Sequence, residues 1–208
     1  IFNTWQLFAQ VTNPPIDCIR EEIVTSTSVY VGRDGNLLEE EPKNCQVLKI
    51  NNPILTNTDM LKIKNMKVEG FKAVTVPITY YKSAPLDRAM DRLFVEVDRA
   101  HRAGANILIL SDRGVDENHV AIPSLLAVSA VHQHLVKTKK RTSLAIILES
   151  GEPREVHHFA TLLGYGACAI NPYLALDTIH ELIEEGMIKK DYYAAVEDYN
   201  HAVISGIV

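Results

Sequence analysis

The sequence is poor in the residues that build metal centres and disulfide frameworks. Its 208 residues include three cysteines, Cys18, Cys45 and Cys168, which stand far apart and form no CxxC pair. A zinc or iron–sulfur site needs clustered thiolates, and a secreted disulfide framework needs an even number of cysteines. We therefore expect free thiols in a reducing compartment.

Long apolar runs and dense basic charge are also absent. No run approaches the roughly 18 residues that span a bilayer. The start, "IFNTWQLFAQV", lacks a Met and the charged region of a signal peptide, so we expect a chain cut from a longer polypeptide. The densest basic run is "KTKKR" at residues 137–141. One such run is typical of a helix end, so we expect binding to neither nucleic acid nor membrane.

Short nucleotide-binding and hydrolase motifs are missing as well. The sequence contains no GxGxxG, GxxxxGK or GxSxG. "GYGA" at residues 164–167 follows a helical pattern and precedes a strand, which is the place of a helix C-cap rather than a phosphate loop. No Ser, Thr or Cys has an obvious paired base. We therefore expect no catalytic residue, no cofactor-binding residue and no metal ligand in this chain.

A regular alternation of strand and helix patterns runs from about residue 69 to the end. Nearly continuous apolar runs predict buried strands at residues 71–80, 106–110, 143–150 and 167–171. Helical periodicity predicts helices at residues 85–104, 122–138, 152–164, 172–186 and 191–207. This alternation predicts an α/β fold with a parallel sheet of about four βα units. The sheet is either open or half of a (β/α)8 barrel, because the chain is short for a complete barrel.

Residues 1–68 have a different texture. The turn signals "TNPPID", "GRDGN", "EEPKN" and "NNPILTN" predict short local structure. We expect one or two helical turns near Asp17 and a short strand or extended segment at residues 45–50. We therefore divide the chain into an irregular N-terminal extension, residues 1–68, and an α/β core, residues 69–208.

Polar residues follow two of the predicted strands, where α/β proteins usually bind ligands. Ser111, Asp112 and Arg113 follow the second strand, and Glu149 ends the third. Asp112 could bind a cation or act as a base, and Arg113 could hold a carboxylate or a phosphate. The alternative, which we favour from the residues alone, is that they end the strand and lead into the next helix.

The stretch "ESGEPREVHH" has the composition of a metal or acid–base site, with Glu149, Glu152, His157 and His158. Helical geometry argues against such a site, because adjacent positions diverge by about 100° and do not chelate one ion easily. We expect His157 at the border of the buried helix face.

Longer stretches carry a more specific signal. "QVTNPPIDCIREEIV", "NPILTN", "ILILSDRGVDENHVAIPSLLAVSAVHQHL" and "SLAIILESGEPREVHHFATLLGYGACAINPYLA" occur in one order and spacing. Together they resemble the central domain of glutamate synthase, in the large subunit of the NADPH-dependent enzyme or in the ferredoxin-dependent enzyme. The resemblance covers residues 10–175 and continues more weakly to the C-terminus.

The resemblance implies a linker and scaffold domain inside a larger enzyme of glutamate biosynthesis. In that family a glutamine amidotransferase domain precedes the central domain, and an FMN-binding barrel with a 3Fe-4S cluster follows it. Ammonia passes through an internal tunnel to the FMN domain, where 2-oxoglutarate becomes glutamate. FMN and the cluster are thus implied for the full enzyme and not for this segment, and the partners are the other domains of the same polypeptide. The implied compartment is the cytoplasm, or the plastid stroma in a plant or alga.

On this interpretation the polar loop residues hold the loops themselves or meet a partner domain. The candidates are Asn13, Pro14, Pro15, Asp17, Ser111, Asp112, Arg113, Glu149 and His157. "TNPPID" is either a stiffened contact segment or an ordinary surface turn. Apolar surface left without its partner domains predicts that the isolated domain can self-associate. The alternative function is a standalone α/β module that binds a small anionic ligand with its strand-end loops.

Overall fold

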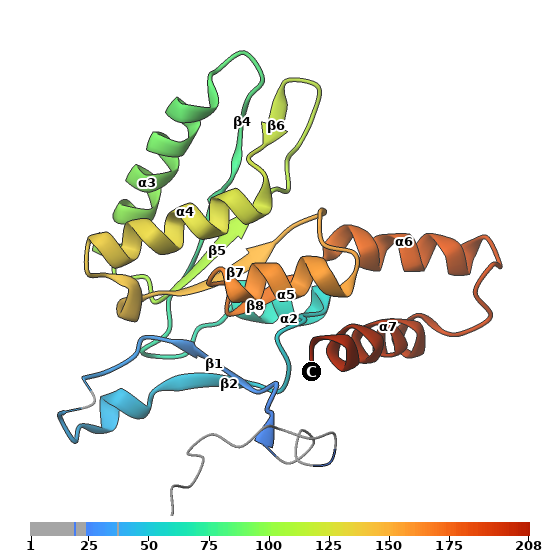
Figure 1. Ribbon diagram of the computed structural model, residues 1–208, viewed down its shortest axis with the longest axis horizontal. Helices are drawn as coiled ribbons and strands as arrows, with labels where there is room; N and C mark the ends of the chain where they lie inside the picture. Colours follow the sequence, from blue (N-terminus) through green and yellow to red (C-terminus); the bar gives the residue numbers. More distant parts are fainter. Residues whose placement is uncertain (1–18, 20–23, 37) are drawn as a thin grey trace, which may run out of the picture.

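A four-stranded parallel sheet forms the centre of the molecule (Figure 1). The computed structural model describes residue 19, residues 24–36 and residues 38–208. The strands of the sheet, in spatial order, are β3 (Ala73–Pro77), β5 (Ile107–Ser111), β7 (Ala145–Glu149) and β8 (Ala169–Asn171). All neighbours are parallel, which confirms the predicted α/β class. Every residue of β5 and β7 is buried, as expected when both faces of a sheet are covered.

One face of the sheet is covered by the helices that connect its strands. These helices are α3 (Leu86–Arg102), α4 (Ser124–Lys137) and α5 (Val156–Gly164). Leu93, Val131 and Phe159 of the three helices share one apolar core with Leu108 and Leu148 of the sheet. The strand order never reverses, and successive helices return to the same face. This singly wound arrangement is that of half a (β/α)8 barrel rather than of a doubly wound sheet.

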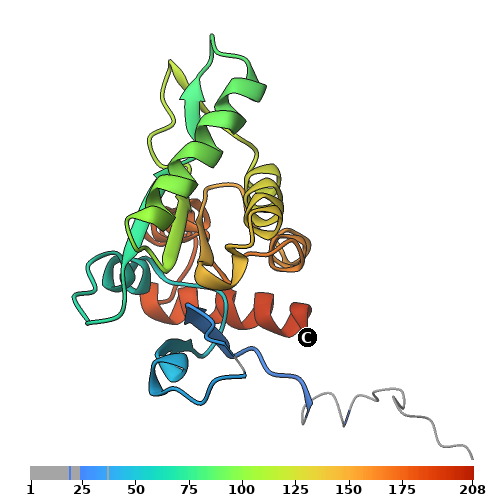
Figure 2. The ribbon, with the colours of Figure 1, turned by 90° about the vertical axis from the view of Figure 1, so that its left-hand side faces the viewer.

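The opposite face is covered by the segment that precedes β3. Strands β1 (Val29–Gly32) and β2 (Val47–Ile50) form an antiparallel hairpin, and helix α2 (Asn57–Lys64) follows. Val31, Met60 and Ile63 pack against Ile109 and Ile147 of the sheet. Figure 2 shows α2 and α4 on opposite sides of the sheet. The N-terminal segment thus fills the side that further strands would close in a complete barrel.

The same segment also covers the edge of β8. The amide of Leu55 donates to the carbonyl of Ile170 at 2.8 Å, and the amide of Ile170 donates to the carbonyl of Pro53 at 2.7 Å. A strand edge occupied in this way is closed to pairing with another chain.

Several elements differ from the sequence prediction. The sequence predicts a turn at "NNPILTN" and no helix after it, but α2 begins directly there at Asn57. The predicted strand at residues 71–80 is divided into β3 and β4 (Thr79–Tyr81). Strand β4 pairs with β6 (His119–Ala121), which the sequence analysis places in a loop, and the pair forms a projecting arm (Figure 1). The boundary at residues 68 and 69 stays a prediction.

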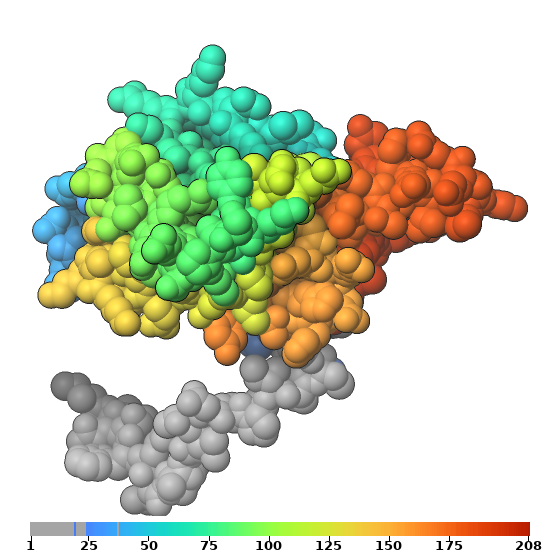
Figure 3. All heavy atoms as spheres, turned by 90° about the horizontal axis from the view of Figure 1, so that it is seen from above, coloured from blue at the N-terminus to red at the C-terminus, as the bar shows by residue number. Residues whose placement is uncertain are grey.

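The chain closes with two helices, as predicted: α6 (Tyr173–Glu184) and α7 (Tyr192–Ile207). Helix α7 packs against both α5 and α6, and α6 projects as an orange lobe from one end of the molecule (Figure 3). Two short 3-10 helices, η1 (Pro42–Cys45) and η2 (Arg141–Ser143), lie in loops. Among the described residues, no helix combines the length and the apolar character needed to cross a membrane.

Candidate functional site

Three neighbouring strands of the sheet each end in a buried polar residue. Ser111 of β5 is paired in register with Glu149 of β7, which is paired in turn with Asn171 of β8. Their exposed fractions are 5%, 2% and 0%. Side chains two positions apart point to one face of a strand, so these three continue the row of Ile109 and Ile147 toward α2. The polar side chains at the three strand ends therefore lie together beneath α2.

Glu149 lies at the centre of this polar cluster. Nζ of Lys64 donates to both carboxylate oxygens at 2.8 Å. Nε of Arg113 donates to Oε1 at 2.9 Å, and Oγ of Ser111 donates to Oε2 at 2.5 Å. Burial acts to raise the pKa of Glu149, but the hydrogen bonds from Lys64, Ser111 and Arg113 outweigh it and lower the pKa. The carboxylate is thus ionised, and both of its oxygens are occupied.

Asp112 forms a second layer of the same cluster and is 4% exposed. Its Oδ2 accepts a hydrogen bond from Oγ of Ser150 at 2.6 Å and one from the amide of Gly151 at 3.0 Å. Burial, and then the hydrogen bond with Asp112, raise the pKa of Tyr173. The guanidinium of Arg113 lies 3.9 Å from the centre of the Tyr173 ring, a cation–π contact. These contacts join the loops after β5 and β7 to the first residue of α6.

Asn171 connects β8 to the start of α2. Its Nδ2 donates to the carbonyl of Leu55 and to Oδ1 of Asn57, both at 3.0 Å. Nδ2 of Asn57 donates in turn to Oδ1 of Asp177 on α6, at 3.2 Å. Oδ1 of Asn171 is buried and has no hydrogen-bond partner within the described part of the chain.

The predicted site residues divide into three groups. Ser111, Asp112, Arg113 and Glu149 lie together in the cluster. His157 is exposed on α5 and takes no part in it. The other candidates, Asn13, Pro14, Pro15 and Asp17, lie outside the described residues.

Lys64, Asn171 and Tyr173 of the cluster were not predicted from the sequence. Asn171 could have been predicted, because it ends a predicted strand just as Glu149 does. No sequence pattern pointed to Lys64, because it belongs to helix α2, which was not predicted.

Glu152 has a different role from the one its position suggests. The sequence places it at the start of the helix that follows β7. Instead its Oε2 accepts a hydrogen bond from the amide of Ser124 at 2.9 Å and another from the Ser124 hydroxyl, at the first residue of α4. A carboxylate there accepts a hydrogen bond from an amide that has no partner within the helix. Its negative charge also interacts favourably with the positive end of the helix dipole.

The charges of the cluster satisfy one another. A general base or a metal ligand needs a free lone pair facing a substrate or ion, and the Glu149 oxygens are already taken by donors of this chain. No three His, Cys, Asp or Glu side chains of the described residues are grouped so that they could hold a metal ion. The arrangement is suited to fixing α2, two strand-end loops and α6 relative to the sheet.

Residues 4–208 match the family described as the glutamate synthase central domain. The chain belongs to this family. The central domain is 44% identical to the glutamate synthase (NADPH) large chain of Bacillus subtilis, over 100% of this chain and 14% of that protein. It is 42% identical to the glutamate synthase (NADH) of Schizosaccharomyces pombe, over 98% of this chain and 10% of that protein.

A plant relative carries the same similarity. The central domain is 40% identical to the chloroplastic ferredoxin-dependent glutamate synthase of Spinacia oleracea, over 85% of this chain and 11% of that protein. The resemblance found in the sequence is thus confirmed. The chain spans only 10% to 14% of the length of the relatives named here.

Proposed function

We propose that this central domain is a linker and scaffold within a glutamate synthase polypeptide. It connects the glutamine amidotransferase domain to the FMN-binding synthase domain and helps to form the path of ammonia between them. The full polypeptide makes glutamate from glutamine and 2-oxoglutarate, with FMN and a 3Fe-4S cluster bound outside this chain. Its compartment is the cytoplasm, or the plastid stroma in plants, where the spinach relative is named chloroplastic.

The observation that carries the proposal is the closed hydrogen bonding of Glu149. A scaffold that aligns two distant active sites has to keep its own loops in one arrangement. Lys64 at the end of α2 binds this carboxylate of β7, and so do Ser111 and Arg113 at the end of β5 and in the loop after it, so three segments meet at Glu149. A buried ionic network of this kind holds one arrangement, because any displaced member leaves a buried charge without a partner.

The alternative is a standalone module that binds a small molecule with these strand-end loops. It has weaker support, because a ligand at Glu149 or Asp112 would have to displace donors of the chain itself. The match over nearly the whole chain to a small part of much longer relatives also favours a domain of a larger protein.

The test is the coupling of the two reactions in the full-length polypeptide carrying Arg113→Ala. The Arg113 side chain is 44% exposed, so its loss alters the surface beside the cluster more than the core. We expect a smaller fraction of the ammonia released from glutamine to appear in new glutamate. Glutamine hydrolysis and synthesis from free ammonia should each keep their rates.

The matched control is Arg88→Ala, which removes an exposed Arg in the first turn of α3 that is not a member of the Glu149 cluster. It should leave the coupling unchanged. If Arg113→Ala changes neither coupling nor stability, the loop after β5 does no more than connect this strand to the next element. The scaffold proposal then loses its structural basis. Saturable binding of a small anion that Arg113→Ala abolishes would favour the standalone module instead.

A further inference from the structure

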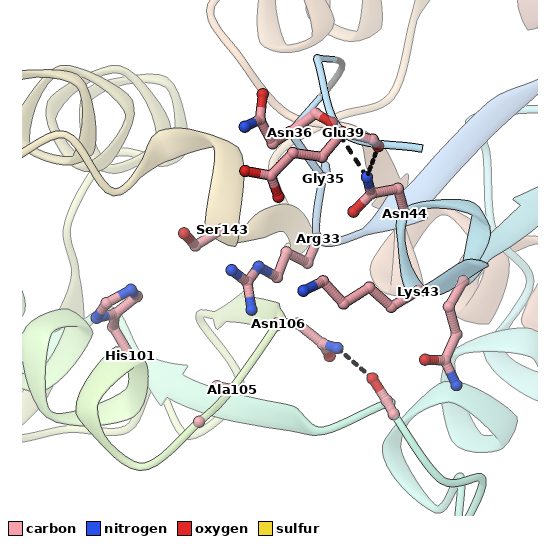
Figure 4. A pocket seen from close by; sticks show the side chains of 13 residues that line it. Arg33, Gly35, Asn36, Glu39, Lys43, Asn44, His101, Ala105, Asn106 and Ser143 are labelled. Carbon is pink, nitrogen blue, oxygen red and sulfur yellow. Dashed lines mark hydrogen bonds between the residues drawn. The ribbon is translucent and has the colours of Figure 1, made fainter. Parts of the chain in front are cut away.

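A cavity of about 670 Å³ opens at the other end of the sheet, away from the Glu149 cluster. It lies between the loop of the β1–β2 hairpin, the end of α3 and the start of β5 (Figure 4). Pockets for small molecules commonly have volumes of about 300 to 1,000 Å³. The cavity is thus large enough for a metabolite, and its wall is polar. Charged and polar side chains on this wall include Arg33, Glu39, Lys43, His101 and Ser143.

Two opposite charges face this cavity without binding each other. The guanidinium of Arg33 and the carboxylate of Glu39 both point into it (Figure 4). They form no ion pair with each other, and neither side chain has a hydrogen-bond or ionic partner in the described chain. The cavity therefore contains one positive and one negative group that are not paired with each other.

Hydrogen bonds within the hairpin loop, and one to the loop before β7, hold described parts of the segment that carries both charges. Nδ2 of Asn44 donates to the carbonyls of Asn36 at 3.0 Å and Glu39 at 2.7 Å. The amide of Asp34 donates to the carbonyl of Thr142 at 2.8 Å. The backbone beside Arg33 is thereby tied to η2, and the backbone of Glu39 is tied to Asn44 within the loop.

The remaining polar groups of the wall differ in what they can offer a ligand. The ammonium of Lys43 is paired with Glu41. The hydroxyl of Ser143 and the imidazole of His101 make no side-chain hydrogen bond within the described chain. The unpaired groups of the wall thus include the Arg33 guanidinium, the Glu39 carboxylate, the Ser143 hydroxyl and the His101 imidazole, and the wall also carries the amide side chains of Asn36, Asn44, Gln46 and Asn106.

We propose that this cavity binds a free α-amino acid, with its carboxylate on Arg33 and its ammonium on Glu39. The planar fork of a guanidinium matches a carboxylate, and a carboxylate accepts strongly from an ammonium. A ligand with only negative charge would face Glu39 unpaired, and one with only positive charge would face Arg33 unpaired. A zwitterion satisfies both, while Ser143 and His101 face the space left for its side chain. This inference is independent of the proposed scaffold function.

The test uses the full-length polypeptide and the common L-amino acids, added one at a time. Hydrogen exchange of residues 33–46 reports the cavity, so binding at other sites of the polypeptide is not counted. We expect at least one amino acid to protect these amides saturably. Arg33→Met and Glu39→Gln should each raise the dissociation constant obtained from this protection about tenfold, which corresponds to about 1.4 kcal/mol of binding free energy. Both side chains are exposed and unpartnered, so the melting temperature of each variant should equal that of the wild type.

The charge assignment is tested with analogues of whichever amino acid binds. The acid that lacks the amino group should bind more weakly to the wild type, and Glu39→Gln should remove that difference. Arg88→Met, a change of the same kind on α3, should leave the protection of residues 33–46 intact. The proposal is overturned if no amino acid gives protection that Arg33→Met removes, or if the analogue without the amino group binds the wild type equally well.

Discussion

Lys64 and Glu149, 85 positions apart in the sequence, form the ion pair that fixes helix α2 to the end of strand β7. Nζ of Lys64 lies 2.8 Å from each oxygen of a carboxylate whose side chain is 3% exposed. A buried carboxylate stays ionised only when donors surround it. The position of α2 and the charge of Glu149 therefore depend on each other, and this relationship can be tested directly.

Lys64→Met should destabilise the protein. The change keeps most of the side-chain volume but leaves Glu149 with only Arg113 and Ser111 as donors. Breaking a buried ion pair costs roughly 3 to 5 kcal/mol, and the Lys64 side chain is 26% exposed. Water can replace part of the lost pairing, so we expect a fall of about 2 kcal/mol in the free energy of unfolding, measured by urea denaturation.

Lys62→Met is the matched control on the same helix. Its side chain is 73% exposed and lies 3.6 Å from Asp59. Exposed pairs of this kind contribute less than about 1 kcal/mol. Equal losses for the two Lys variants would show that the Glu149 pair does not stabilise the fold.

Glu149→Gln should make stability depend less on pH. The folded pKa of Glu149 is lowered, so its contribution is fully present above the unfolded value of about 4.3 and is lost as pH falls through the folded value. At about pH 7 the variant should be less stable by about 3 kcal/mol, because Lys64 and Arg113 lose their anion. Urea denaturation at about pH 3 should give a smaller difference between the two proteins.

Glu117→Gln, an exposed carboxylate in the loop before β6, provides the comparison for this pH series. Its stability should follow that of the wild type at every pH. A Glu149→Gln deficit that stays constant down to about pH 3 would mean that the Glu149 charge is not what the network stabilises.

The strands could be predicted because the local composition shows which segments are buried. Ile107–Ser111 and Ala145–Glu149 are continuous apolar runs that end in a polar residue, and runs of this kind fit a sheet covered on both faces. Helix α2 was not predictable in the same way. It buries only Met60 and Ile63, and its remaining residues are mostly polar. What holds α2 in place is tertiary: the sheet beneath it and the ion pair to Glu149.

The polar cluster was predictable only in part, for the same reason. Chain order places Ser111 and Glu149 at strand ends, and the rule that parallel strands share one carboxyl edge brings them together. The partners that decide their chemistry, Lys64 and Tyr173, come from elements whose approach depends on packing. Without them, the residues that suggested a catalytic loop could not be recognised as mutually satisfied charges.

Thr56→Ala should destabilise α2 through its first turn. Oγ1 of Thr56 accepts a hydrogen bond from the amide of Asp59 at 3.1 Å, and the Asp59 side chain reaches back to the amide of Thr56. Loss of such a capping box costs about 1 kcal/mol. Thr58→Ala, an exposed position of the same helix, should cost nothing because Ala is the better helix former. Urea denaturation of the two variants separates the cap from helix propensity, and equal stabilities would contradict the capping role.

Gly166→Ala should be more damaging than Gly114→Ala, although both glycines have positive φ, 117° and 103° respectively. An added Cβ at Gly114 meets open space, so only backbone strain of about 1 kcal/mol is expected. At Gly166 the Cβ would meet the ring of His132, with Cγ at 2.8 Å. That ring cannot turn away freely, because its Nδ1 accepts a hydrogen bond from Nε of Arg141 at 3.0 Å. We therefore expect a cost of about 3 kcal/mol for Gly166→Ala.

A double-mutant cycle with His132→Ala identifies the source of the extra cost at Gly166. Removing the imidazole takes away the atoms that the new Cβ would strike, while the positive φ at Gly166 stays. In the His132→Ala background, Gly166→Ala should cost only about 1 kcal/mol, as Gly114→Ala does in the wild type. An unchanged cost of about 3 kcal/mol in that background would mean that backbone strain alone, and not packing of α4 against the turn after α5, requires glycine at this position.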